Sequence, residues 1–317
     1  MTEQSTPAFS HYSVMLSECI DGLNIDPHGT YVDCTRGGGG HSLEIAKRLQ
    51  AGGRLICIDQ DPAALTAATA RLSDYADRIT FVHNNFSNIR AILDDLGVDN
   101  VNGALIDLGV SSYQLDTPER GFSYQHDAPL DMRMDPSSPR SAYDIVNGES
   151  FEELRRIISE YGEERFANSI AKNIIRAREE KPVETTFDLV DIIKRSIPAK
   201  NRQEGGHPAK RTFQAIRIAV NDELAIIEPT VKSLISVLAP GGRLCVLTFH
   251  SLEDRIVKQT YQAAAKGCTC PPDFPVCICG KKPEIEIITR KPMTASEEEL
   301  AENNRSHSAK LRICEKI

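Results

Sequence analysis

The stretch VDCTRGGGGHS, residues 32–42, decides the fold, because it joins the end of a short apolar strand to the start of a helical pattern at 41–50. A second apolar run, RLICIDQD at 54–61, follows that helix and completes one βαβ unit. Glycines at such a junction let the backbone pass close to a ligand, and the amides at the start of the helix suit an anionic group. The glycine run therefore predicts a ligand site at a strand-to-helix turn.

The same alternation continues along the chain. Helical patterns at 62–72 and 89–96 separate apolar runs at 79–86 and 101–109. Strands that alternate with helices at this spacing predict a parallel, doubly wound α/β sheet with helices on both faces. Later runs are interpreted as further strands, at 243–249 and, at an edge of the sheet, at 285–289 and 310–314.

The alternation stops after Gly109, and helical stripes without strands follow at 164–178 and 187–197. We therefore expect a helical insertion within the α/β domain. The predicted domains are a discontinuous α/β domain at 1–110 and 206–317 and an inserted, mainly helical domain at 111–205.

Composition restricts the kind of protein. Of the 317 residues, 40% are hydrophobic and 26% are charged, close to the average for globular proteins. Neither a secretion signal nor a run of about 18 apolar residues occurs, so we expect a cytoplasmic protein without a membrane partner. The net charge of -8 argues against indiscriminate nucleic-acid binding, which needs a surplus of Lys and Arg. Any RNA contact must come from local basic patches.

Residues at the ends of three strands extend the glycine site. Asp59 follows the glycine run by about 20 residues, the spacing at which an acid binds ribose hydroxyls in nucleotide-binding folds. Asp107 ends the fourth strand on the same edge, where it fits either a ligand contact or a loop cap, and Phe86 fits either an adenine contact or core packing. NAD and S-adenosylmethionine both carry an adenosine ribose, so the residues alone leave both ligands open.

Several segments together resemble one family, the bacterial methyltransferases that modify N4 of a cytosine in 16S ribosomal RNA. Beside the glycine turn, the residues that carry the resemblance are HYSVMLSE at 11–18, DLGVSSYQLD at 107–116, RGFSY at 120–124, PLDMRMD at 129–135, RTFQAIRIAVNDEL at 211–224, PGGRLCVLTFHSLEDRIVK at 240–258 and KPMTASEEELAENNRSHSAKLR at 291–312. They span nearly the whole chain. Tyr113 departs from the pattern, since Pro is common at that place in related chains.

The resemblance implies a Rossmann-like S-adenosylmethionine-dependent methyltransferase domain with an inserted helical domain. It implies that the substrate is cytosine 1402 of 16S rRNA in the 30S small ribosomal subunit. The implied cofactor contacts are Gly39, Gly40, His41, Asp59, Phe86, Asp107 and Gln114. Two alternatives remain, an NAD-dependent oxidoreductase, which gives no reason for DLGVSSYQLD, and a non-enzymatic ribosome assembly factor, against which the intact glycines and acids argue.

The chemistry of an amine acceptor points to further candidates. The lone pair of the cytosine N4 amine is delocalised into the ring, so the enzyme must hold this nitrogen in line with the methyl carbon and accept a hydrogen bond from its N–H. The loop at 107–112 could supply that acceptor, with Ser111 and Ser112 as candidates, and His250 after a later strand is the third. Each of the three also fits a purely structural role.

Basic residues collect in PAKNRQEGGHPAKRTFQAIR, at 198–217. The residues are Lys200, Arg202, His207, Lys210 and Arg211, and Arg120, Arg133 and Arg140 could extend the patch. Such a loop could bind RNA phosphates, with Phe122 and Tyr124 as stacking surfaces for an unpaired base, or it could be a solvated loop beside two packed rings. Given an RNA substrate, we expect the insertion to recognise that substrate.

Four of the nine cysteines lie within twelve residues, in CTCPPDFPVCIC at 268–279. An odd number of cysteines without a secretion signal predicts reduced thiols rather than a disulfide framework. Cys268, Cys270, Cys277 and Cys279 offer four thiolates, which suit tetrahedral zinc, although structural sites usually have wider spacing within each pair. Bound zinc and four free thiols in a surface loop both fit this pattern.

Overall fold

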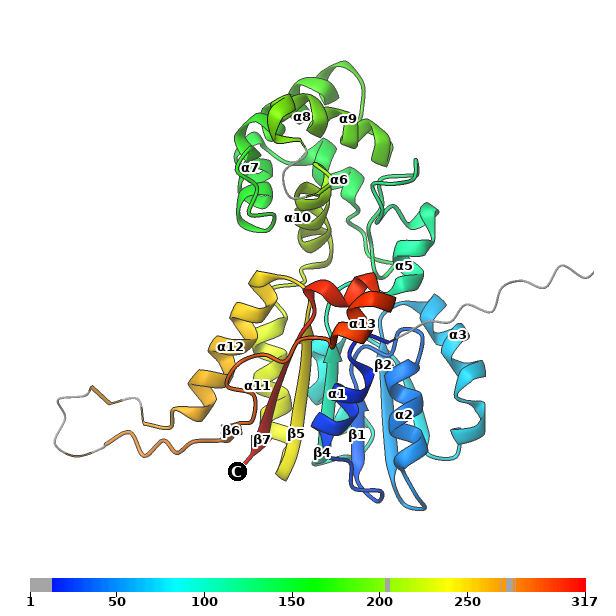
Figure 1. Ribbon diagram of the computed structural model, residues 1–317, viewed down its shortest axis with the longest axis vertical. Helices are drawn as coiled ribbons and strands as arrows, with labels where there is room; N and C mark the ends of the chain where they lie inside the picture. The colour runs from blue at the N-terminus through cyan, green and yellow to red at the C-terminus, as the bar shows by residue number, and fades with distance from the viewer. Residues whose placement is uncertain (1–12, 203–205, 269, 272–275, 277) are drawn as a thin grey trace, which may run out of the picture. The chain divides into compact units, whose positions relative to one another are not determined.

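The computed structural model of the chain describes residues 13–202, 206–268, 270–271, 276 and 278–317, without the side chains of 65–68 and 70. The chain divides into two compact units. Unit 1 combines residues 1–108 with 228–317, and unit 2 is formed by residues 109–227 (Figure 1). Unit 1 is α/β, whereas the regular structure of unit 2 is helical.

Unit 1 is built on a sheet of seven described strands in the order β3-β2-β1-β4-β5-β7-β6. Its strands are β1 (Thr30–Asp33), β2 (Arg54–Asp59), β3 (Ile79–His83), β4 (Val101–Asp107), β5 (Leu238–Thr248), β6 (Ile285–Ile287) and β7 (Lys310–Lys316). β1 to β5 run parallel, as predicted, and β7 lies antiparallel between β5 and β6. The strand order reverses direction between β1 and β4, and ligands of such sheets bind beyond the carboxyl ends of the strands at this point.

The prediction of two edge strands near the C-terminus is only half right. β6 is the edge strand, but β7 pairs on both sides, with Ile313 opposite Cys245 of β5 and Cys314 opposite Ile287 of β6. Both sides of β7 are therefore covered by hydrogen bonds. Its buried residues Leu311 and Ile313 belong to the core of unit 1.

The helices of unit 1 cover this sheet. They are α1 (Leu16–Leu23), α2 (Gly40–Arg48), α3 (Pro62–Arg71), α4 (Ile89–Asp95), α11 (Ile227–Val237), α12 (Ser251–Ala265) and α13 (Glu297–Glu302), with short 3-10 turns η1 (Ser73–Tyr75), η2 (Phe86–Asn88) and η5 (Asn304–Ser308). α1 and α2 bury Leu23 and Ile45 against Tyr31, Leu55 and Leu105 of the strands. No helix in the described part of the chain is both long and apolar enough to cross a membrane.

Unit 2 has its own core. It contains α5 (Ser112–Asp116), α6 (Ala142–Gly148), α7 (Phe151–Glu160), α8 (Ala167–Glu180), α9 (Thr186–Ser196) and α10 (Lys210–Asn221), with η3 (Pro118–Arg120) and η4 (Ala199–Asn201). The boundary predicted at 205 falls too early. α10 buries Phe213, Ala215 and Ile216 in the same apolar cluster as α7 and α8, so unit 2 continues to Ile227.

Candidate functional site

The glycine run forms the turn between β1 and α2. Gly37 and Gly39 have positive φ angles of 49° and 75°, a region that residues with a Cβ rarely adopt. Gly39 is the N-cap of α2, and a Cβ on Gly40 would collide with the hydroxyl of Ser13. The turn therefore requires glycine at both predicted cofactor positions, at Gly39 for its dihedral angle and at Gly40 for space.

Asp59 ends β2 and is tied to the glycine turn. Its Oδ2 accepts a hydrogen bond of 2.7 Å from the N–H of Gly37, and its Oδ1 accepts one of 2.9 Å from the N–H of Asp61. Burial raises the pKa of Asp59, while these two hydrogen bonds and the charge of Arg36 act in the opposite direction. The carboxyl group is thus fixed beside the turn, and its remaining lone pairs can accept from ribose hydroxyls.

Asp107, at the end of β4, faces His41 in the first turn of α2. His41 Nδ1 lies 3.8 Å from Asp107 Oδ2, and His41 Nε2 lies 3.1 Å from the carbonyl oxygen of Val14. Because a carbonyl can only accept, Nε2 carries a proton, and Nδ1 faces the carboxyl group. Burial raises the pKa of Asp107 to about 8, and the charges of Asp33 and Glu253 add to this rise.

Asp33, which the sequence analysis did not select, ends β1 between these two acids and is 1% exposed. Its Oδ2 accepts a hydrogen bond of 2.5 Å from Ser42 Oγ, and its Oδ1 accepts one of 3.2 Å from the N–H of Thr35. Thr35 Oγ1 in turn accepts a hydrogen bond of 2.6 Å from the N–H of Asp107. These bonds connect the ends of β1 and β4 with the first turn of α2.

Arg36 is a second residue of this site that the sequence did not predict. It is 3% exposed, and none of its three guanidinium nitrogens has a hydrogen-bond partner among the described residues. The guanidinium lies 5.4 Å from the centroid of the Phe81 ring. Burial raises the pKa values of Asp33 and Asp59, and the charge of Arg36 opposes this rise. A buried cation with unused donors at the ligand turn is a candidate for binding an anionic part of the ligand.

His250 caps the N-terminus of α12. Its Nδ1 accepts from the N–H of Glu253 at 3.5 Å, while Glu253 Oε2 accepts from the N–H groups of Phe249 and His250 at 2.7 Å and 3.2 Å. His250 Nε2 lies 3.1 Å from Glu253 Oε1, outside hydrogen-bond geometry. His250 therefore has a structural role whether or not it also meets a substrate.

Phe86 lies at the same edge of the sheet as Asp59. The predicted strand ends earlier than expected, at His83, and Phe86 begins the turn η2. The N–H of Asn84 donates a hydrogen bond of 3.1 Å to the carbonyl oxygen of Asp59, so the two strand ends are joined just before this turn. The Phe86 side chain is 9% exposed and mostly packed.

The remaining candidates belong to unit 2. Ser111 is the N-cap of α5, where its Oγ accepts from the N–H of Gln114 at 3.2 Å and its own N–H donates to Gln114 Oε1 at 3.0 Å. Ser112 is 7% exposed and Gln114 is 5% exposed. This capping box stabilises the helix and orients the side chains of Ser111 and Gln114.

The acidic edge of unit 1 fits a cationic ligand. Asp33, Asp59, Asp107 and Glu253 lie at or just beyond strand ends, and the charges of Asp33 and Glu253 both act on Asp107. S-adenosylmethionine carries a sulfonium and an ammonium group, which carboxylates attract, whereas NAD carries a pyrophosphate, which they repel. The N-terminus of α2 and Arg36 can receive the carboxylate of S-adenosylmethionine. The residues present therefore fit this cofactor.

The predicted basic patch is smaller than the sequence indicated. Arg120 donates to the carbonyl oxygens of Arg133 and Met134, Arg133 pairs with Asp131, and Arg140 pairs with Glu149. These three arginines thus have partners within unit 2. Phe122 is 6% exposed within the core.

Tyr124 stacks on His207, with ring centroids 4.4 Å apart. Partial burial, with the charge of Lys194, lowers the pKa of His207. Of the predicted basic loop, the side chains of Lys200, Arg202, Lys210 and Arg211 are exposed, although Arg202 and Arg211 also donate to the carbonyl oxygens of Ile197 and Glu163. Tyr124 stacks on the histidine of the same loop.

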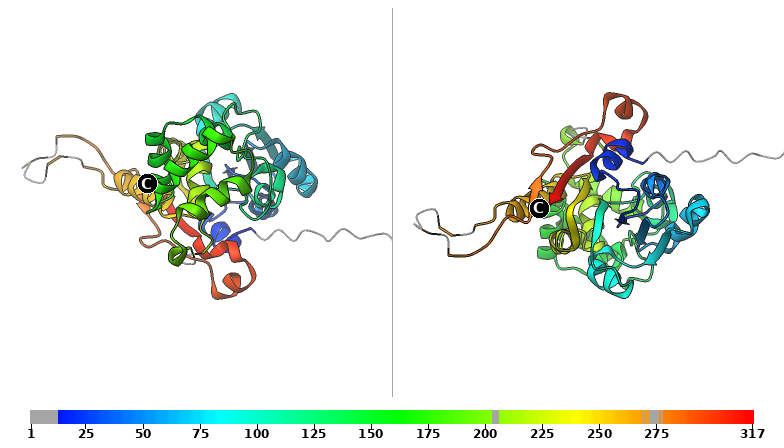
Figure 2. Two further views of the ribbon diagram at one scale, coloured as in Figure 1. Left: turned by 90° about the horizontal axis from the view of Figure 1, so that it is seen from above. Right: turned by 90° about the horizontal axis from the view of Figure 1, so that it is seen from below.

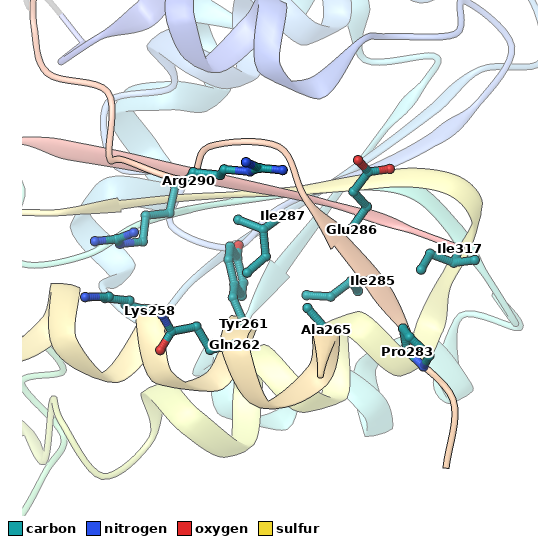
Figure 3. Close-up of a pocket in the computed structure, with 11 residues that line it drawn as sticks. Lys258, Tyr261, Gln262, Ala265, Pro283, Ile285, Glu286, Ile287, Arg290 and Ile317 are labelled. Carbon is teal, nitrogen blue, oxygen red and sulfur yellow. The ribbon is translucent and has the colours of Figure 1, made fainter. Parts of the chain in front are cut away.

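A cavity of 470 Å³ lies between α12, β6 and β7, away from the predicted cofactor residues (Figure 3). Tyr261, Ile285 and Ile287 are among its apolar lining residues, and Lys258, Glu286 and Arg290 are among its charged ones. None of the predicted cofactor residues lines it. The cavity is therefore separate from the acidic edge.

The fold and the acidic edge together define the class: the chain is an S-adenosylmethionine-dependent methyltransferase of Rossmann-like fold. Residues 8–317 match the profile of the MraW methylase family, and the chain belongs to that family. This membership confirms the resemblance and excludes the NAD-dependent oxidoreductase.

Relatives match along almost their whole length. A protein of Lachnospira eligens is 59% identical over 98% of both chains, and one of Brevibacillus brevis is 58% identical over 99% of this chain and 100% of the relative. A third, of Symbiobacterium thermophilum, is 57% identical over 98% of both chains. All three are named ribosomal RNA small subunit methyltransferase H.

The site residues missed by the sequence analysis are Asp33, Arg36 and Glu253. Asp33 ends a strand just as Asp59 and Asp107 do, so the strand-end rule could have found it. Glu253 stands three residues after the N-cap His250, the spacing of a capping box. No sequence signal distinguishes Arg36, because its burial depends on Phe81 of a later strand.

Proposed function

We propose that the protein transfers a methyl group from S-adenosylmethionine to N4 of cytosine 1402 in 16S rRNA, and that the 30S small ribosomal subunit is the substrate. The observation that carries the proposal is the acidic edge around Asp107 beside the glycine turn, in a chain that belongs to the MraW methylase family over residues 8–317. The names of the relatives support an rRNA of the small subunit as substrate.

Unit 1 binds and orients the cofactor. Gly39 and Gly40 would let the backbone of the turn approach it, Asp59 would accept from its ribose hydroxyls, and Asp107 would attract its positive charge. When bound, S-adenosylmethionine supplies an activated methyl group on a sulfonium. The contribution of the chain is then to hold the acceptor nitrogen in line with that methyl carbon, which removes most of the entropic barrier of a bimolecular reaction.

The acceptor amine needs a partner for its N–H. Ser111 is the leading candidate, since its Oγ accepts only one long hydrogen bond, of 3.2 Å, within α5 and keeps a lone pair. Ser112 and His250 are the other candidates. A hydrogen bond from the amine to a hydroxyl oxygen localises the nitrogen lone pair and favours a pyramidal nitrogen, which is the more nucleophilic form.

Unit 2 recognises the RNA in this proposal. The loop around η4 carries the exposed cations Lys200, Arg202 and Lys210, which can bind phosphates of a folded RNA. The net charge of -8 makes such local contacts necessary, because the surface as a whole repels RNA. Recognition by a separate helical unit suits the shaped surface of an assembled subunit.

Methyl transfer with tritiated S-adenosylmethionine tests the proposal. The substrates are 30S subunits from cells that lack this methyltransferase, and the 16S rRNA is digested to nucleosides after the reaction. We expect label in N4-methylcytidine. Subunits in which cytosine 1402 is replaced by uridine, which has no N4 amine, are the control and should stay unlabelled. Label in another base, or at another cytosine, would overturn the assignment, and equal labelling of naked 16S rRNA would contradict the 30S substrate.

A further inference from the structure

Three cysteine sulfurs lie together between α12 and β6, outside the cofactor site. The Sγ atoms of Cys268, Cys270 and Cys279 all lie within 4.8 Å of one another, and those of Cys268 and Cys279 are 3.7 Å apart. Cys270 is half-buried and the other two are exposed. They are brought together from both arms of a loop, eleven residues apart along the chain.

The spacing of the sulfurs matches a metal site. Zinc–thiolate bonds are about 2.3 Å long, so two sulfurs at the corners of a tetrahedron around zinc lie about 3.8 Å apart. The distance between Cys268 and Cys279, 3.7 Å, has this value. It is much longer than a disulfide bond, which is about 2.05 Å.

Backbone N–H groups point at the same sulfurs. The N–H of Cys270 donates to Cys268 Sγ at 3.4 Å, and the N–H of Ile278 donates to Cys270 Sγ at 3.4 Å. Hydrogen-bond partners of this kind orient the ligands of metal sites. The loop backbone therefore holds these sulfur atoms in place.

The base of the loop is closed by the fold. The N–H of Glu284 donates to the carbonyl oxygen of Ala264 at 2.9 Å, and Gly267, at a φ of 61°, lies against Pro283. The described parts of the loop leave α12 and return to β6 and extend away from the rest of unit 1 (Figures 1 and 2). Val276 and Ile278 are 69% and 75% exposed, so these two apolar side chains are not packed into a core.

The five cysteines outside this loop differ from the loop cysteines in their burial. They are buried in unit 1: Cys19, Cys34, Cys57, Cys245 and Cys314. Burial raises the pKa of each of these thiols, which keeps them protonated. Among the described cysteines, the thiols that solvent reaches are thus those of the loop.

We propose that Cys268, Cys270 and Cys279 bind a structural zinc ion that ties the two arms of the loop together at these three residues. A cluster of cysteine sulfurs with one pair at the separation expected around a tetrahedral ion suits zinc among the common divalent metals. Cys277, the fourth cysteine of the predicted zinc site, lies outside the described residues. The site has no part in methyl transfer, because it is separate from the acidic edge, and it does not depend on the proposed rRNA substrate.

Metal analysis tests the site directly. The full-length protein is purified under reducing conditions without chelator or added metal, and its zinc content is measured by mass spectrometry. We expect one zinc per chain, a loss of zinc in Cys268→Ser and Cys279→Ser, and full occupancy in Ile278→Ser. The Ile278→Ser variant is the matched control, since it changes the same loop but keeps every thiol and the N–H that points at Cys270.

A second measurement needs no variant. Titration of the wild-type protein with an organomercurial, which binds thiolates and displaces their metal, should release zinc in step with modification of the exposed thiols, as read with a colorimetric zinc indicator. Cobalt in place of zinc should give the intense visible absorption of a tetrahedral thiolate site. The proposal would be overturned if the wild type contained no zinc or contained iron in its place. Equal zinc content in the wild type and in Cys268→Ser would also overturn it, as would a mass lowered by two hydrogens, which indicates a disulfide.

Discussion

Cofactor affinity should depend on the protonation of Asp107. Burial and the charges of Asp33 and Glu253 raise the pKa of Asp107 to about 8, so the acid is mostly protonated at neutral pH in the protein alone. A cationic cofactor attracts the ionised form. Binding of S-adenosylmethionine near pH 7 should therefore release a proton, and affinity should rise with pH until Asp107 is ionised before binding.

The size of the effect follows from the pKa. At about pH 7, one unit below the pKa, roughly one molecule in ten has Asp107 ionised, so the dissociation constant should be about tenfold higher than above about pH 9, or about 1.4 kcal/mol. Titration calorimetry between about pH 6 and about pH 9.5 measures this change, and buffers of different ionisation enthalpy count the released protons. S-adenosylhomocysteine, which lacks the sulfonium charge, should show a smaller change.

The variant Asp107→Asn is the reference for this experiment. The amino group of the ligand titrates near the same pH, and the variant reports that contribution alone. We expect weaker binding in the variant and a flatter pH profile than in the wild type. Parallel profiles for the two proteins would refute the role of Asp107 as a titrating partner of the cofactor.

Three further substitutions test the site. Gly40→Ala should cost about 1 to 3 kcal/mol of cofactor binding through the clash with Ser13, and adding Ser13→Gly should restore most of it; a double variant as weak as the single one would contradict the steric explanation. Arg36→Met should weaken cofactor binding by about 1.5 to 3 kcal/mol, and unchanged calorimetric affinity would exclude Arg36 from the site. Ser111→Ala should lower turnover about tenfold with cofactor affinity retained, whereas Ser141→Ala, which removes the equivalent N-cap of α6, should cost only about 1 kcal/mol of stability; equal turnover in the two variants would reduce Ser111 to a cap.

The parallel sheet was predictable because its signals are local. Each strand from β1 to β4 is a short apolar run that ends in a polar residue, and the glycines at 37–40 indicate the turn between β1 and α2. Asp59 and Asp107 follow from the same rule, since the carboxyl ends of parallel strands meet at one edge. The place of β7 inside the sheet was not predictable, because strand order is set by partners far away in sequence, such as Cys245 for Ile313.

The burial of charged side chains was the other feature that the sequence did not predict. Arg36 looks like an ordinary polar residue of a turn, and only the packed structure shows that it is 3% exposed and that Asp33, at a strand end, is 1% exposed. The domain boundary predicted at residue 205 was wrong for a related reason. The apolar stripe of α10 is evident in the sequence, but the stripe does not tell whether Phe213 packs against the sheet or against α7 and α8.

The interruption of unit 1 has a consequence for how the chain folds. β4 and β5 pair side by side, yet unit 2 separates them by roughly 120 residues of chain. Closing a flexible loop of that length costs about 4 kcal/mol of chain entropy, and much less if the intervening helices have already condensed into a compact body. Early folding of unit 2 would thus accelerate assembly of the cofactor sheet. Substitutions in the core around Ile158 and Phe213 would then slow refolding of unit 1 without touching it.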